Sequence, residues 1–250
     1  MRTPLPDPLG EADGSRSDDD VDGARAQLVA LASRGVDWPA LPPVSGHPRP
    51  AAVLVLFGVL DGRPAAHPSA AVPADLDVLL VGRAASLAHH PGQVAFPGGR
   101  LDREDEGPEA AALREAAEET GVDPAGIEVL GTLPELPVHV SNHVVTPVLA
   151  WWATPSPVAV VDHQESATVF RAPVADLLDP ANRRTATLPA RARAGRPLVA
   201  RPDAGPAFLV THDSGTHLVW GFTAAVLDRL FTELGWAEVW DTSRTVEVPL

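Results

Sequence analysis

The segment REAAEETG at residues 114–121, preceded by PGG at residues 97–99, is the most informative part of this sequence. Proline favours the first turn of a helix, and glycine favours the position just past its end. Pro108 and Gly121 stand at those two positions. The sequence therefore predicts a helix over residues 108–120, preceded in the chain by a glycine turn.

The predicted helix gathers carboxylates on one face. Glu115, Glu118 and Glu119 are spaced i, i+3 and i+4, which places them side by side. One interpretation is a solvated acidic face. The other is a metal site, because carboxylate oxygens are hard ligands that suit Mg²⁺ or Mn²⁺. Arg114 stands four residues before Glu118, where it can pair with that carboxylate and fix its rotamer, so we count Arg114 among the catalytic residues.

The segment from Gly99 to Val122 resembles the Nudix box, in which a glycine and an acidic residue precede an Arg-Glu pair and a Glu-Glu pair. The second half of the segment matches at each functional position. The first half is one residue longer than the general pattern, so either Asp105 or Glu106 can take the first acidic position. The resemblance implies a hydrolase that cleaves a nucleoside diphosphate linked to some other group.

The resemblance also implies roles for individual residues. Glu115, Glu118 and Glu119 would hold Mg²⁺ or Mn²⁺ together with the backbone carbonyl of Gly99. A glutamate would then take the proton from the attacking water, and the two candidates are Glu115 and Glu165. For Glu165 the alternative is an exposed residue on a loop.

The sequence before the box resembles one subfamily in particular. Residues 79–99 are similar to the signature of the coenzyme A pyrophosphatases, and the similarity extends over about residues 50–236. That subfamily accepts aspartate at the first acidic position, which favours Asp105. It often has an arginine where this chain has Ala88, which is a departure. The implied reaction converts coenzyme A or acyl-coenzyme A to 3′,5′-ADP and (acyl-)4′-phosphopantetheine.

Four basic residues near the glycine turn are candidates to bind the substrate phosphates: Arg83, His89, His90 and Arg100. Guanidinium groups suit phosphate because they donate paired hydrogen bonds, although each residue could equally be a plain surface side chain. Two other functions stay open. One is a Nudix hydrolase of another substrate, such as ADP-ribose or a dinucleotide. The other is a non-catalytic Nudix-fold binding module, which would typically have lost box carboxylates that are present here.

Charge and composition limit the partners. The net charge of −14 argues against a broad nucleic-acid interface, which needs a basic face. The sequence has no cysteine, no apolar run of the length of a membrane span and no basic-then-apolar leader. We therefore expect a cytoplasmic protein that binds neither nucleic acid nor a membrane, although the absence of cysteine also fits an exported protein. The resemblance implies a small nucleoside diphosphate substrate, and we expect a monomer or homodimer.

We expect a disordered acidic tail over residues 1–22, a helix and proline-rich connector over 23–50, and a Nudix hydrolase domain over 51–250. Residues 183–206 show little pattern and are expected to be mobile. Hydrophobic patterning predicts strands and helices along the rest of the domain. The strands are expected at 52–59, 76–81, 127–133, 144–153 and 167–171, with a hairpin around 208–221 and a helix at 222–234. Mixed strands with helices on two sides predict an α/β fold, a Nudix-type α/β/α sandwich with a mixed sheet and a catalytic loop-helix-loop.

Overall fold

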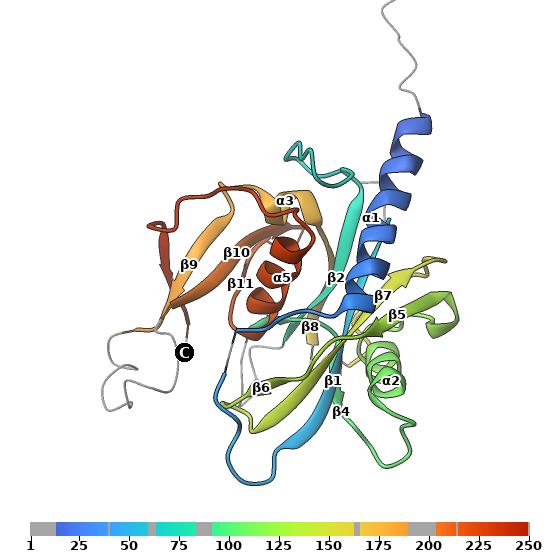
Figure 1. The fold of residues 1–250 in the computed structure, drawn as a ribbon, viewed down its shortest axis with the longest axis vertical. Coiled ribbons are helices and arrows are strands. Elements are labelled where there is room, and N and C mark those ends of the chain that lie inside the picture. The colour runs from blue at the N-terminus through green and yellow to red at the C-terminus, as the bar shows by residue number, and fades with distance from the viewer. Residues whose placement is uncertain are drawn as a thin grey trace, which may run out of the picture.

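A mixed sheet, with eight strands among the described residues, forms the centre of the molecule (Figure 1). The computed structural model describes residues 14–39, 41–59, 64–83, 92–162, 166–189, 204–213 and 215–249. The strands of the main sheet are β1 (Arg49–Val59), β2 (Leu76–Arg83), β3 (Val94–Ala95), β4 (Gly98–Arg100), β5 (Ile127–Thr132), β6 (Leu136–Val138), β7 (His143–Trp152) and β8 (Ser166–Pro173).

The central strand of this sheet is β1, which runs parallel to β7 and antiparallel to β2. The sheet continues beyond β2 with β8 and beyond β7 with β5. Near its start, β1 pairs with the short strand β4, so that Val53 lies opposite Gly98 and Ala52 lies opposite Gly99. The sheet topology therefore places the glycine turn directly beside the central strand.

Helices cover both faces of the sheet: α2 (Pro108–Thr120) lies on one face, and α1 (Gly14–Arg34) and α5 (Phe222–Glu233) lie on the other (Figure 1). Successive residues of a strand point to opposite faces. Leu54 and Leu56 of β1 accordingly pack with the alanines of α2, whereas Val55 and Phe57 pack on the side of α1 and α5. The predicted α/β sandwich with a mixed sheet is confirmed.

A second sheet of four strands lies beside the first: β9 (Arg183–Thr187), β10 (Ala204–His212), β11 (Gly215–Val219) and β12 (Thr245–Glu247). The short helices α3 (Val174–Leu178) and η1 (Pro124–Gly126) complete the described elements. Residues 183–206, which show little sequence pattern and were expected to be mobile, form strands at both ends of that segment, where β9 and the first residues of β10 lie. Residues 190–203 lie outside the described residues.

The polar strand β9 pairs with β10 and β12 and carries a buried arginine, Arg183. The Arg183 side chain is 1% exposed and pairs with Asp228. Its guanidinium lies 4.4 Å from the centre of the Phe208 ring and 4.8 Å from that of Trp240. Such cation–π contacts stabilise a desolvated arginine. They join distant parts of the chain, so local sequence patterns do not reveal them.

Helix α1 begins at Gly14, inside the segment that was expected to be a disordered tail. The residues expected to lack structure are therefore helical from 14 to 22, and residues 1–13 lie outside the described part. Val21 packs against the core one turn before Ala24, and Leu28 continues the same apolar stripe. This stripe extends the helix toward the N-terminus. None of the described helices is long and apolar enough to cross a membrane.

We predict that Leu28→Ala lowers the free energy of unfolding by about 2–5 kcal/mol, the usual effect of truncating a fully buried leucine. Leu28 is fully buried against the sheet, so the cavity would open in the main core. Urea denaturation measures the change. Val29→Ala, at a neighbouring position that is 37% exposed, is the matched control and should change stability by less than about 0.5 kcal/mol. Equal effects of the two substitutions would mean that α1 does not dock on the sheet.

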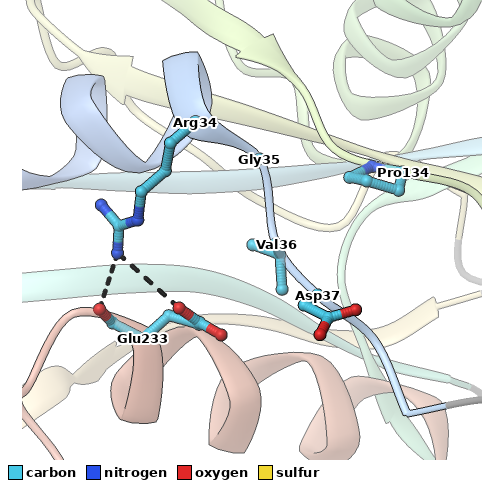
Figure 2. A pocket seen from close by; sticks show the side chains of 6 residues that line it. All are labelled: Arg34, Gly35, Val36, Asp37, Pro134 and Glu233. Carbon is cyan, nitrogen blue, oxygen red and sulfur yellow. Dashed lines mark hydrogen bonds and ion pairs between the residues drawn. The ribbon is translucent and has the colours of Figure 1, made fainter.

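A pocket of about 340 Å³ lies where the C-terminal ends of α1 and α5 meet (Figure 2). Arg34 donates a hydrogen bond of 2.7 Å to the backbone carbonyl of Glu233 and lies 3.9 Å from its carboxylate. Val36 and Pro134 supply an apolar part of the wall. The Arg34 contact joins the two helices of this layer.

Candidate active site

Helix α2 has the bounds that its end residues predict. Pro108 occupies the first turn, and Gly121 ends the helix at φ 69° with its N–H donating to the Ala117 carbonyl. Only glycine adopts this left-handed conformation without strain. Ala112 and Ala116 are fully buried against the sheet. Their small side chains let the helix pack closely, with its acidic face turned toward the glycine turn.

The glycine turn touches two carboxylates of α2. The N–H of Gly98 donates a hydrogen bond of 3.1 Å to Oε2 of Glu119, whose side chain is almost fully buried. A Cβ on Gly99 would collide with the carboxylate of Glu115. Glycine at position 99 therefore makes room for Glu115 against the backbone of the turn.

One guanidinium holds the surrounding acids in place. Arg114 binds both oxygens of Asp105, with Nε–Oδ1 and NH2–Oδ2 distances of 3.0 and 2.9 Å. Its NH1 donates to Glu115 at 3.1 Å and to Glu118 at 3.2 Å. Its NH2 also donates to the backbone carbonyl of Arg100 at 3.1 Å. The predicted pair with Glu118 is present, but Arg114 also ties the loop before α2 to the strand that carries the glycines.

Asp105 takes the first acidic position, which the sequence left open between Asp105 and Glu106. The Asp105 carboxylate is 6% exposed and forms the two-oxygen pair with Arg114. Its Oδ2 also accepts from the backbone N–H of Asp102 at 2.8 Å, which closes the loop. Glu106 is exposed. The one-residue insertion is therefore absorbed in the loop between β4 and α2.

We predict that Asp105→Asn lowers the melting temperature at pH 7 and that the loss shrinks in acid. The hydrogen bond from Arg114 is the main cause that holds the pKa of Asp105 below its ordinary value. The pair therefore stabilises the fold above the pKa of an unfolded aspartate, about 4, and this stabilisation is lost as the pH falls through the lower folded pKa. Thermal melts from pH 7 to pH 3 measure the difference. Glu106→Gln is the control; a larger effect at Glu106 would contradict the assignment.

The site also shifts the pKa of Glu115. Burial raises its pKa, and the neighbouring charges of Glu118 and Asp102 raise it further, while Arg114 opposes the shift. A carboxylate in this state gains from any additional cation nearby, because an opposite charge favours the ionised form. Its side chain is 20% exposed, so it is still accessible from the solvent.

The donor set of this site fits a hard divalent cation. Its acids offer only oxygen ligands, which Mg²⁺ and Mn²⁺ prefer. Because Gly99 has no Cβ, the carboxylate of Glu115 lies directly against the Gly99 backbone. Within the part of the chain that the structure describes, no three acidic or histidine side chains converge on one point. Glu115 and Glu118 instead bind Arg114, and Glu119 binds the Gly98 N–H. Metal binding would require these carboxylates to exchange protein donors for the cation.

Of the remaining predicted site residues, Arg83 lies at the end of β2 and Arg100 lies at the end of β4, where it is exposed. Arg83 ends β2 opposite Ser166, and its N–H donates to the carbonyl of Gln93 at 2.9 Å. Its Nε is shielded from solvent and has no hydrogen-bond partner among the described residues. Glu165, His89 and His90 lie outside the described residues. Ser166 follows Glu165 directly, so the sheet brings the neighbour of that glutamate beside Arg83.

The chain is similar to known proteins of one family. The family described as the NUDIX domain matches residues 66–190. An uncharacterized Nudix hydrolase, NudL, from Citrobacter koseri is 35% identical over 162 residues, which cover 63% of this chain and 75% of that protein. NudL from Escherichia coli strain K12 is 34% identical over the same shares of the two chains.

Solved structures with similarity to this chain include two Nudix proteins. RenU, a Nudix hydrolase from M. smegmatis, is 28% identical and has a TM-score of 0.38 over 50% of this chain and 71% of its own. A MutT/nudix family protein from Enterococcus faecalis is 18% identical and has a TM-score of 0.44 over 91% of this chain and 76% of its own. The match of the NUDIX domain to residues 66–190 and the NudL relatives carry the assignment: this chain belongs to the Nudix family.

Proposed function

We propose that this Nudix hydrolase cleaves the diphosphate of coenzyme A or acyl-coenzyme A, yielding 3′,5′-ADP and (acyl-)4′-phosphopantetheine, with Mg²⁺ or Mn²⁺ as cofactor. The observation that carries the reaction class is the contact of two α2 carboxylates with the glycine turn, Glu119 at the Gly98 N–H and Glu115 against Gly99. Both acids would lie next to the metal-bound diphosphate.

The proposed chemistry uses the acids of α2 in distinct ways. A divalent cation, when bound, screens the charge of the diphosphate and lowers the pKa of a bound water. Glu115, Glu118 and Glu119 would hold it with the carbonyl of Gly99. Arg114 keeps Glu115 and Glu118 in position through its hydrogen bonds, and Asp105 holds Arg114 in turn. These contacts hold Glu115 and Glu118 on one face of α2 before a cation binds, and the cation would then replace part of them.

The general base is Glu115 or Glu165. A base works best when its pKa lies near the working pH, and burial moves the pKa of Glu115 in that direction. A cation bound to Glu115 would instead lower the pKa of this residue, and Glu165 would then be the better proton acceptor. Replacing each glutamate with glutamine and comparing the pH dependence of kcat would separate the two assignments.

The proposed substrate rests on residues 79–99, whose sequence is similar to the coenzyme A pyrophosphatase signature. Part of that signature, including Ala88, His89 and His90, lies outside the described residues. Arg83, which does lie among them, has one guanidinium nitrogen, Nε, that finds no hydrogen-bond partner in the described part of the chain. Another Nudix substrate, such as ADP-ribose or a dinucleotide, is the alternative. A non-catalytic module is less favoured, because every box carboxylate is present.

A substrate panel tests the proposal. Coenzyme A, acyl-coenzyme A, ADP-ribose, NADH and diadenosine polyphosphates should be assayed with Mg²⁺ and with Mn²⁺. We expect kcat/KM to be highest for coenzyme A or an acyl derivative. Faster cleavage of ADP-ribose than of any coenzyme A form would contradict the substrate assignment. No cleavage of any compound with either metal would favour the binding module.

A further inference from the structure

Three basic side chains lie together on the sheet face opposite α2. Arg49 of β1 is the register partner of His143 on β7, and Arg100 of β4 is the partner of Ala51. Residues two apart on a strand, and residues directly opposite in a ladder, share a face. Arg49 and Ala51 are an even number of residues from Val55 and Phe57 on β1, so all four lie on the same face, the one that packs against α1 and α5. Arg49, Arg100 and His143 therefore form one group, which we call the basic cluster.

The basic cluster carries positive charge that the described residues do not neutralise. The ion pairs of the described chain include none to Arg49 or Arg100. Burial lowers the pKa of His143, and the charges of Arg49 and Arg100 lower it further. The two guanidinium groups are thus close enough to act on the same imidazole. An unpaired cationic group is unexpected in a chain of net charge −14, which has many acids available for pairing.

Two hydrogen bonds hold the backbone around the cluster. NH2 of Arg49 donates to the carbonyl of Ser141 at 2.9 Å, and the Arg49 N–H donates to the carbonyl of Asn142 at 3.0 Å. Asn142 has a left-handed backbone with φ 55°, which turns the chain sharply before His143. The turn therefore fixes one guanidinium beside the start of β7 and leaves its other nitrogens available to a ligand.

The cluster is directly connected to the candidate active site. Arg100 follows Gly99 in the chain, and its carbonyl accepts the hydrogen bond from Arg114. A Cβ on Gly98 would meet the backbone of β1, and one on Gly99 would meet Glu115, so the thin backbone of β4 alone separates the acids of α2 on one face from the basic cluster on the other. Among the described strands β4 pairs with β1 only, so a ligand whose diphosphate meets Glu115 and Glu119 could extend around β4 and place a second anionic group at the cluster.

We propose that Arg49, Arg100 and His143 form a subsite for a phosphate monoester on the ribose of the nucleoside diphosphate substrate. The inference rests on the proposed function, in which the substrate carries a 3′-phosphate. A phosphate monoester has close to two negative charges at neutral pH, which matches two guanidinium groups. Guanidinium forks bind phosphate through paired hydrogen bonds, and a neutral imidazole can donate one more. The diphosphate itself would be held on the opposite face, by the α2 site, so the cluster is available for the additional phosphate.

Binding of adenosine 3′,5′-bisphosphate and of 5′-AMP, measured by isothermal titration calorimetry, tests the subsite without turnover. These probes differ only in the 3′-phosphate. We expect the full chain to bind adenosine 3′,5′-bisphosphate at least about tenfold more tightly than 5′-AMP, because hydrogen bonds to a charged group usually contribute that much affinity. Arg49→Gln and Arg100→Gln should each remove most of that preference. Arg103→Gln is the matched control, because Arg103 is an exposed arginine in the loop after β4, and it should keep the preference.

Each outcome of this experiment bears on one assignment. If the wild-type chain binds the two probes equally, or if Arg49→Gln weakens both by the same factor, the subsite proposal is overturned. Loss of the preference in Arg103→Gln as well would mean a general charge effect, which also overturns it. A clear preference that depends on Arg49 and Arg100, together with no cleavage of coenzyme A, would support the subsite and contradict the proposed substrate.

Discussion

Replacing Glu119 or Glu118 with glutamine is expected to lower kcat by roughly a hundredfold or more, as loss of a preorganised charge in an active site usually does. Glutamine keeps the size of the side chain and can still accept the 3.1 Å hydrogen bond from the Gly98 N–H at position 119. It cannot supply the negative charge that a divalent cation requires. The fold should persist in both variants, since the Glu118 side chain is 61% exposed and Glu119 keeps its hydrogen bond.

Initial rates across a series of Mg²⁺ concentrations, with thermal melts in parallel, measure this prediction. The matched control is Glu109→Gln, which removes the same charge from an exposed position in the first turn of the same helix. It should retain nearly normal kcat. Near-normal turnover and metal dependence in either Glu118→Gln or Glu119→Gln would contradict the assignment of these carboxylates as metal ligands.

Much of the fold could be predicted from the sequence because its signals are local. The bounds of α2 follow from Pro108 and Gly121, which act within one helical turn. Long apolar runs predicted β1, β2 and β7 to within a few residues, since both faces of these strands are buried. The carboxylate face of α2 is likewise a property of helical spacing alone.

The features that sequence analysis missed depend on contacts between distant segments. The buried Arg183 is stable in β9 because Phe208 and Trp240 enclose it. Arg114 was expected to pair with Glu118, whereas its two-oxygen partner Asp105 lies nine residues earlier, in a loop. The nearness of Arg49, Arg100 and His143 arises from the pairing of β1 with β4 and with β7. Periodicity within one element carries no information about such pairs.

Alanine substitutions at the two glycines of the turn should have opposite effects on folding and activity. A Cβ at Gly98 would collide with the carbonyl oxygen of Ala52 and lie 2.6 Å from Cα of Val53, and the residue has φ 154°, which only glycine adopts without strain. Because those atoms are backbone of the central strand, they cannot move aside. We expect Gly98→Ala to destabilise the fold by about 3 kcal/mol or more, the range of severe backbone strain and overpacking.

At Gly99 the three atoms nearest to the added Cβ all belong to the carboxylate of Glu115, which ends a flexible side chain and can turn away. Gly99→Ala should therefore keep a melting temperature close to that of the wild type but lose activity by about ten- to a hundredfold, because a displaced carboxylate no longer holds its productive position. Thermal melts and initial rates on both variants measure the contrast. Full activity in Gly99→Ala would show that Glu115 does not need to approach the turn, and that the contact between them is packing rather than part of the catalytic site.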